Sequence, residues 1–348
     1  NESPQQVSAG FSKKPITPTI IDTWNDANND NEYNEDDGDT YNDLNNNGKF
    51  DAFWIAGMSN AKPAQGVHDD VWSRAMVLDD GKHRIAMVSL DAIGFLHGDV
   101  IDIRNRVPVE LGLDYVLVSS THTHESNDLV GIWGENMFNS GVNLAQMEYV
   151  KEQTVASIVE AAKNLRPAKL VFAEDLTGRD SVLMKDTRKP IVKAPGIHLM
   201  QVLDASTNKT MGTLINWSNH PETLWSQNLL ISSDFPHYVR EAVENGVYHG
   251  NELMQEGLGG VAVYFTGTIG GLMAPHPSIA INDPFTGEAY SEPTFDKAKA
   301  LGDHIALMSL EALRQRGDTI TESKLSVRAK TLFAPLDNIT FKIASGIG

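Results

Sequence analysis

The sequence of 348 residues contains no cysteine. Disulfide bonds, thiolate metal sites and cysteine nucleophiles are therefore excluded, and the redox compartment stays open because cysteine-free chains occur inside and outside cells. Long apolar runs are missing as well, since no stretch approaches the roughly 18 consecutive apolar residues that a membrane-spanning helix needs. We therefore expect no transmembrane segment.

Basic residues are scarce relative to acidic ones. The chain has 28 Lys and Arg against 46 Asp and Glu, which gives a formal charge of −18. Binding to a phosphate backbone needs a basic surface, so nucleic acid is excluded as a partner. Hydrophobic residues make up 41% of the chain and charged residues 21%, as in ordinary globular proteins. We expect a substantial core.

The acidic residues are concentrated near the N-terminus. Ten Asp and Glu, nine Asn and one basic residue lie within 22–51, a composition typical of a solvated linker. One part of it has oxygen-bearing side chains at loop positions 1, 3, 5 and 9 and Gly48 at position 6, the order in which a loop wraps calcium. These side chains are Asp43, Asn45, Asn47 and Asp51. We predict a calcium loop in an N-terminal extension over 1–51, although Trp54 stands where an EF-hand has Glu.

From residue 52 onward, the hydrophobic pattern predicts strands that alternate with helices. A hairpin is expected over 74–91, and further strands over 115–120, 169–174, 197–203, 211–217, 260–265 and 324–332. Helices are expected over 99–111, 144–165 and 294–316, with a further helix capped by Ser232 and running to Asn245. This alternation predicts one α/β domain over 52–348, with a mixed, partly parallel β-sheet flanked by helices.

Four of the predicted strands end in chemically distinctive residues. They are followed by Asp91, by Thr121-His122-Thr123-His124-Glu125, by Asn219-His220-Pro221-Glu222-Thr223 and by the Gly-rich run 266–271. In open α/β sheets, ligands bind beyond the carboxyl ends of the strands. We therefore expect these four segments to converge on one active site.

Histidines in two of these segments are candidate metal ligands. Side chains alternate along an extended segment, so His122 and His124 face the same side. Two or three imidazoles with an open water position make a catalytic zinc site, and His220 at another strand end favours this reading over two histidines in a polar loop. His68 and Asp91 are further candidates for the site, while a structural hydrogen bond is the alternative for His68.

Several of these segments resemble the neutral/alkaline ceramidase family. The resemblance is carried by Thr121-His122-Thr123-His124, by Asn216-Trp-Ser-Asn-His220-Pro, by the Arg74-Ala-Met-Val hairpin and by Gly260-Val-Ala-Val-Tyr-Phe-Thr-Gly-Thr. It begins near Ala52, continues to the end of the chain and covers the first part of that family's catalytic domain.

Members of that family are secreted or surface zinc amidases that cleave the N-acyl bond of ceramide. The resemblance implies that His122 and His220 bind zinc and that His124 acts as acid and base and orients the water. It also implies that Arg188, in Asp186-Thr-Arg-Lys-Pro190, helps to hold the substrate or the developing oxyanion. A lipid substrate, transient contact with a membrane surface, and a secreted, periplasmic or cell-surface location follow from the same resemblance.

The sequence departs from the family in three places. The family takes its remaining zinc ligands, a Glu and a Tyr, from a stretch beyond Gly348, so we expect a fragment or completion of the site by another group such as Asp91. The family's Gly-Asp-Val-Ser-Pro turn reads Gly270-Gly-Leu-Met-Ala-Pro275 here, without its Asp and Ser. Glu125-Ser-Asn-Asp follows His124, where the family has small residues.

The function predicted from the sequence is a zinc-dependent hydrolase that cleaves an amide, with the N-acyl bond of a ceramide-like lipid as its first candidate. One alternative is a metal-dependent hydrolase of another ester or amide. The other is a calcium-dependent extracellular binding module without catalysis, whose histidines are structural. The chain opens on Asn1 rather than Met, which leaves an exported origin open.

Overall fold

The computed structural model describes residues 5–270, 273–332, 335 and 337–339. Its main sheet runs in the order β16-β12-β11-β9-β2-β6-β7-β8, with β20 paired to β9. These strands are β2 (Ser8–Pro15), β6 (Trp72–Asp79), β7 (Arg84–Leu90), β8 (Tyr115–Ser120), β9 (Arg166–Asp175), β11 (Ile197–Asp204), β12 (Thr210–Trp217), β16 (Val261–Thr266) and β20 (Asp318–Ile320). The β7–β8 and β12–β16 pairs are parallel and the others are antiparallel. The predicted mixed, partly parallel sheet is confirmed.

Helices and short ribbons surround this sheet. The helices are α1 (His97–Arg106), α2 (Leu144–Lys163), α3 (Phe235–Asn245) and α4 (Phe295–Arg316). The two-stranded ribbons are β1 (Gln5–Gln6) with β21 (Glu322–Ser323), β3 (Thr23–Asn25) with β4 (Thr40–Asn42), β5 (Gly66–Val67) with β13 (Leu230–Ile231), β10 (Lys185–Asp186) with β17 (Met273–Ala274), β14 (Val247–His249) with β15 (Glu252–Gln255), and β18 (Ile281–Asn282) with β19 (Ala289–Tyr290). In the described ranges, no helix combines the length and hydropathy needed to cross a bilayer.

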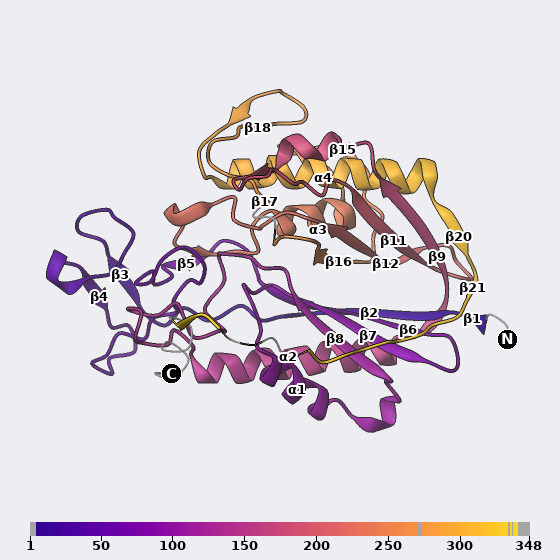
Figure 1. The fold of residues 1–348 in the computed structure, drawn as a ribbon, viewed down its shortest axis with the longest axis horizontal. Helices are drawn as coiled ribbons and strands as arrows, with labels where there is room; N and C mark the ends of the chain where they lie inside the picture. Colours follow the sequence, from indigo (N-terminus) through magenta and orange to yellow (C-terminus); the bar gives the residue numbers. More distant parts are fainter. Residues whose placement is uncertain (1–4, 271–272, 333–334, 336, 340–348) are drawn as a thin grey trace.

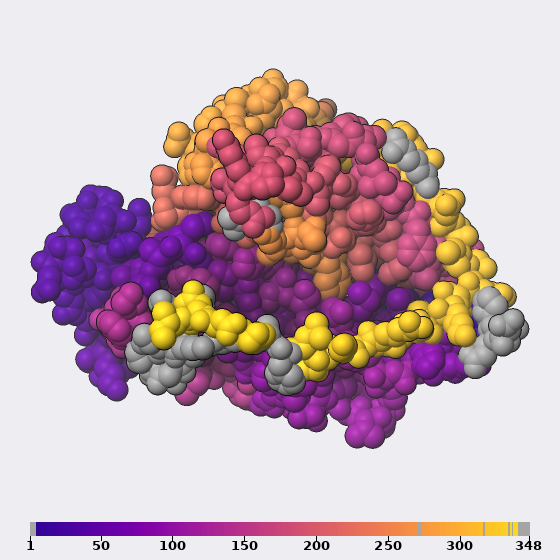
Figure 2. Space-filling model, in the orientation of Figure 1, coloured from indigo at the N-terminus to yellow at the C-terminus, as the bar shows by residue number. Residues whose placement is uncertain are grey.

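The main sheet folds back on itself to form two stacked halves. The sheet bends at the β2–β9 pair, where only two residue pairs are formed, Ser8 with Pro167 and Ala9 with Arg166. Helices α1 and α2 cover the half containing β6, β7 and β8, and helices α3 and α4 cover the half containing β11, β12 and β16 (Figure 1). The fold therefore has four layers, with helices outside and two sheet layers inside. Figure 2 shows a hollow between the two halves, with the C-terminal segment, in yellow, crossing this face below it.

The sequence pattern of β6 shows why it lies inside the molecule. Ala75 and Val77 belong to the hydrophobic cluster beneath α2, whereas Met76 and Leu78 belong to the cluster between the two sheet halves. Successive side chains of a strand point to opposite faces, so a strand that is apolar at every position can fill two cores at once. The uninterrupted apolar run of β6 is therefore the signature of a strand covered on both faces.

Contacts across the two halves bring the carboxyl ends of their parallel strands together. The Ser89 hydroxyl on β7 donates to the Tyr264 carbonyl on β16 at 2.5 Å. The Thr266 hydroxyl at the end of β16 donates to the Thr121 carbonyl just after β8, also at 2.5 Å. Because β12 lies parallel to β16, the ends of all four strands reach the same region of the molecule.

Most predicted elements are present, and three details are wrong. The helix expected over 99–111 ends at Arg106. Residues 324–332 form no strand, because Leu325 packs against the core between the sheets and its N–H donates to Asp80 rather than to a neighbouring strand. The cap of α3 is Asp234 rather than Ser232, since the Asp234 carboxylate accepts from the Phe235 N–H. Gly271, within the predicted Gly-rich run, lies outside the described residues.

A close contact between helix α2 and strand β2 supplies a test of this packing. A Cβ atom added to Gly10 on β2 would lie 2.0 Å from the Ala161 carbonyl oxygen of α2. We expect Gly10→Ala to lower the free energy of unfolding by about 1–3 kcal/mol, because backbone atoms must move apart. Gly98→Ala on α1, where nothing lies within 4 Å of the new Cβ, is the matched control and should not destabilise the protein. Urea denaturation measures both, and equal stabilities would contradict the packing.

Candidate metal centre

Three histidines gather where the strands end. His122 and His124 follow β8, and His220 follows β12. One ligand atom from each lies within 4.8 Å of the corresponding atoms of the other two. The centroid of the His122 ring is 4.8 Å from that of His124 and 5.0 Å from that of His220. Donor atoms at such spacing, drawn from two sheet halves, form a site that a single metal ion could share.

Backbone carbonyl groups orient two of the three rings. Nδ1 of His122 lies 2.5 Å from the Ile93 carbonyl oxygen, and Nδ1 of His220 lies 2.7 Å from the Met273 carbonyl oxygen. A carbonyl oxygen only accepts hydrogen bonds, so in each ring the proton is on Nδ1 and Nε2 presents a lone pair. This is the usual arrangement of histidines that bind a metal through Nε2. Burial lowers the pKa of both rings and so favours the neutral form that a metal requires.

The third ring, His124, is buried without a hydrogen-bond partner. It is 9% exposed, and neither of its ring nitrogens has a partner within the described residues. Nδ1 lies 3.5 Å from an Oε2 atom of Glu222, and burial holds the pKa of His124 well below its usual range. Gly57 packs against this ring, where an added Cβ would come 2.8 Å from Nδ1. The three rings together fit a metal ion, because all of them are neutral and have a nitrogen to spare.

Strained backbone accompanies the site. The backbone φ angle is 67° at His122 and 58° at Asp234, and residues other than glycine rarely adopt positive φ angles of this size. The His122 N–H donates to the Ala92 carbonyl oxygen at 2.9 Å, which holds the residue in place together with its ring contact to Ile93. Strain of this kind persists where the surroundings hold it, and it is concentrated at functional sites.

A group of buried polar atoms lies in and around the segment that carries His124. Lys62 is 2% exposed and Glu125 is fully buried, yet Lys62 Nζ and Glu125 Oε1 have no hydrogen-bond partner in the described part of the chain. The same holds for Ser126 Oγ and Asn127 Nδ2. Burial lowers the pKa of Lys62 and raises that of Glu125, and the charge of each residue opposes the shift in the other. Such atoms are normally satisfied by water or a ligand.

Glu222 also belongs to this site, although the sequence pattern did not indicate it. Burial, reinforced by the nearby charge of Asp234, raises the pKa of Glu222 to about 7. The sequence feature that could have indicated Glu222 is its position two residues after His220, because side chains two residues apart in an extended segment point to the same side. His-Pro-Glu is nevertheless a short pattern, and the burial of the carboxylate is visible only in the structure.

The other predicted site residues lie outside the histidine cluster. Arg188 is exposed in the loop after β10, two residues beyond Asp186, which pairs with Met273 of β17. Asp91 is buried and accepts hydrogen bonds from both terminal nitrogens of Arg240, at 2.7 and 2.9 Å, and from the Trp72 N–H and the Ser233 hydroxyl. These four bonds occupy its carboxylate.

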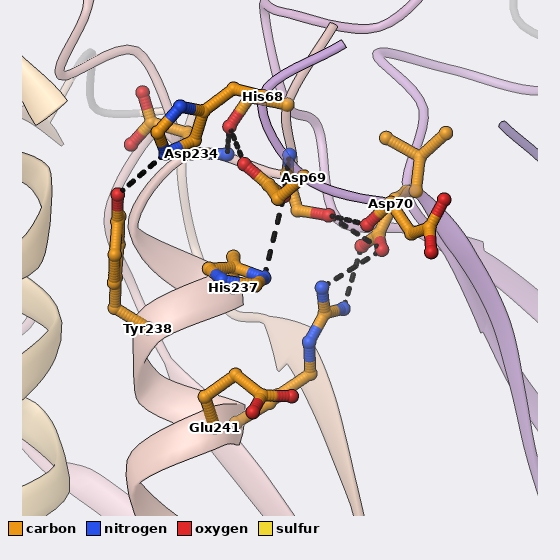
Figure 3. A network of polar contacts seen from close by, with 12 residues as sticks. His68, Asp69, Asp70, Asp234, His237, Tyr238 and Glu241 are labelled. Atoms are coloured by element: carbon orange, nitrogen blue, oxygen red, sulfur yellow. Dashed lines mark hydrogen bonds and ion pairs between the residues drawn. The ribbon is translucent and has the colours of Figure 1, made fainter. Parts of the chain in front are cut away.

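His68 belongs to a separate polar network at the start of α3 (Figure 3). Its Nε2 lies 3.0 Å from the Tyr238 hydroxyl, and its ring stacks on Phe295 with a centroid distance of 3.5 Å. The adjacent Asp69 accepts from the Ser233 N–H at 2.9 Å and lies 3.4 Å from His237. These contacts fasten the segment around β5 to the helix that begins beside the site.

The predicted calcium loop is compact. The Asp43 carboxylate accepts from the N–H groups of Asn47 and Gly48, at 3.0 and 2.7 Å. The side-chain amides of Asn45 and Asn47 donate to Asp51 at 2.7 and 2.6 Å. The four predicted ligand residues therefore take part in the hydrogen bonds that hold the loop together, and calcium binding itself stays a prediction.

Comparison with known proteins shows which solved structures have a similar fold. No model of a protein family and no curated protein matches the chain. Among solved structures, a ceramidase complexed with C2 is similar over 89% of this chain and 44% of its own, with 16% identity and a TM-score of 0.64. The neutral ceramidase from Pseudomonas aeruginosa is similar over 90% of this chain and 45% of its own, with 17% identity and the same TM-score. The chain therefore spans less than half the length of these neighbours, and its fold is that of the ceramidases, as the resemblance implied.

Proposed function

We propose that the protein is a zinc-dependent hydrolase that cleaves the N-acyl amide bond of a ceramide-like lipid. The observation that carries this proposal is the cluster of His122, His124 and His220 at the carboxyl ends of the strands, in a fold shared with ceramidases. As part of this proposal, the enzyme is secreted, periplasmic or at the cell surface and touches membranes transiently, where a lipid substrate would be met.

His122 and His220 are the residues that we expect to hold zinc, each through Nε2. The Ile93 and Met273 carbonyl groups already orient both rings, so the two side chains need little further ordering when the metal binds. Bound zinc supplies a water of lowered pKa and polarises the amide carbonyl group.

The ring of His124 is the group that we expect to transfer the proton. Nδ1 lies 3.5 Å from the Glu222 carboxylate, and Nε2 has no hydrogen-bond partner within the described residues, so Nε2 is available to accept a proton and return it to the nitrogen of the leaving amine. Arg188 lies on an exposed loop, and its role in this proposal is to hold the substrate or the developing oxyanion.

The first test is hydrolysis of a fluorescent short-chain ceramide by the zinc-loaded protein. We expect release of fatty acid, and a loss of at least about 100-fold in kcat/KM for His124→Ala, because acid–base catalysis contributes about 10²–10⁴-fold. His198→Ala, which changes an exposed histidine of β11, is the control and should be as active as the unchanged protein. A protein that binds zinc but leaves ceramide intact would favour the alternative of another ester or amide substrate.

The second test is metal analysis after exhaustive dialysis. We expect one zinc per chain, and loss of that zinc in His122→Ala and in His220→Ala, because each substitution removes one of the two ligands proposed here. His198→Ala should keep its zinc. Full zinc occupancy in the first two variants would contradict the assigned ligands, and calcium without zinc would favour the binding module.

We also propose that the loop of Asp43, Asn45, Asn47 and Asp51 binds calcium as a structural ion. Calcium at about 100 times its Kd should raise the free energy of unfolding by about 2.7 kcal/mol. Asp43→Ala should abolish this increase, whereas Glu110→Ala, at an exposed position outside the loop, should keep it. Thermal unfolding with calcium and with chelator measures the difference, and an unchanged response in Asp43→Ala would remove the calcium proposal.

A further inference from the structure

His124 has the carboxylate of Glu222 beside its ring, whereas the rings of His122 and His220 contact backbone carbonyl oxygens. We propose that Glu222 is a positioning residue: its carboxylate holds the proton of His124 on Nδ1, so that Nε2 faces the other histidines without a proton. The catalytic part of this inference rests on the proposed function, whereas the placement of the proton does not.

The first support is the way the chain delivers Glu222 to the ring. The His124 N–H donates to the Pro221 carbonyl oxygen at 3.0 Å, which joins the segment after β8 to the segment after β12 one residue before Glu222. The carboxylate then lies 3.5 Å from Nδ1. The hydrogen bond therefore holds the two segments together beside His124 Nδ1 and the Glu222 carboxylate.

The second support is the anchoring of the turn that follows Glu222. The Thr223 hydroxyl donates to Asp234 at 2.7 Å, and the Leu224 N–H donates to the same carboxylate at 3.2 Å. Asp234 is buried, has the strained backbone noted above and caps α3. The N-terminus of α3 therefore holds the turn that contains Thr223 and Leu224, and this turn fixes the position of Glu222.

The third support comes from comparing the three rings. Nδ1 of His122 and Nδ1 of His220 each meet a carbonyl oxygen, and Nδ1 of His124 faces the carboxylate oxygen of Glu222. Gly57 leaves the room for this, since any side chain there would overlap the His124 ring. In all three rings the oxygen lies at Nδ1, which leaves Nε2 as the nitrogen available to the centre. A ring that lost its oxygen partner would be free to carry its proton on either nitrogen.

The experiment compares Glu222→Leu with Glu222→Gln in the full zinc-loaded chain. Leucine removes the acceptor at similar volume, and glutamine keeps an acceptor oxygen while removing the charge. Nitrogen-15 NMR of histidine-labelled protein, with the His124 signals assigned by their loss in His124→Gln, reports which ring nitrogen carries the proton. Glu222→Ala replaces Glu222→Leu if the leucine variant does not fold.

We expect the unchanged protein and Glu222→Gln to carry the His124 proton on Nδ1, and Glu222→Leu to lose that preference. Zinc content should stay at one per chain in all three proteins. In the ceramide assay, kcat of Glu222→Leu should fall about 10–100-fold with KM unchanged, and Glu222→Gln should recover most of the loss.

Three results would overturn the inference. The first is a His124 proton on Nδ1 in Glu222→Leu, and the second is a proton on Nε2 in the unchanged protein. The third is loss of zinc from Glu222→Leu and Glu222→Gln alike, which would make Glu222 a metal ligand. Because the proton position is read without substrate, a protein inactive on ceramide would refute the proposed function and leave this inference to be decided by NMR.

Discussion

The stacking of the two sheet halves is the constraint on which the site depends. His122 and His220 lie 98 positions apart in the sequence and on different halves, so only the fold at the β2–β9 pair brings their rings within 5.0 Å. The hydrogen bond from Thr266 to the Thr121 carbonyl oxygen fixes that approach one residue before His122. A shift of one half against the other would therefore separate the histidines before it disturbed either half alone.

Buried ion pairs hold the layers in this register. Arg74 on β6 pairs with Glu244 on α3, and Arg240 on α3 pairs with Asp91 at the end of β7. Removing one partner of such a pair typically costs 3–5 kcal/mol, because the other charge is left buried and unpaired. Apolar contacts tolerate sliding more readily than these directional pairs do, so the pairs specify how α3, and the turn before it, sit above the strand ends.

The parts of this structure that follow from local pattern could be predicted from sequence. The β6–β7 hairpin, α2 and α4 have clear periodicities, and His122 and His220 stand out because they follow strands. Glu222 and Lys62 could not be found in this way, because nothing in a pattern shows that a charged side chain is buried. The role of Asp91 depends on Arg240, 149 positions away, and such a partner becomes visible only in three dimensions.

The unpartnered polar atoms beside His124 carry a further consequence for the chemistry of the site. An unsatisfied buried polar group costs about 1–3 kcal/mol, so the atoms of Lys62, Glu125 and Asn127 would together consume much of a stability of about 5–15 kcal/mol if they stayed dry. We therefore expect water at these atoms in the free protein. A substrate that displaces this water must bring its own hydrogen-bonding groups, and a purely apolar ligand would be rejected at this point.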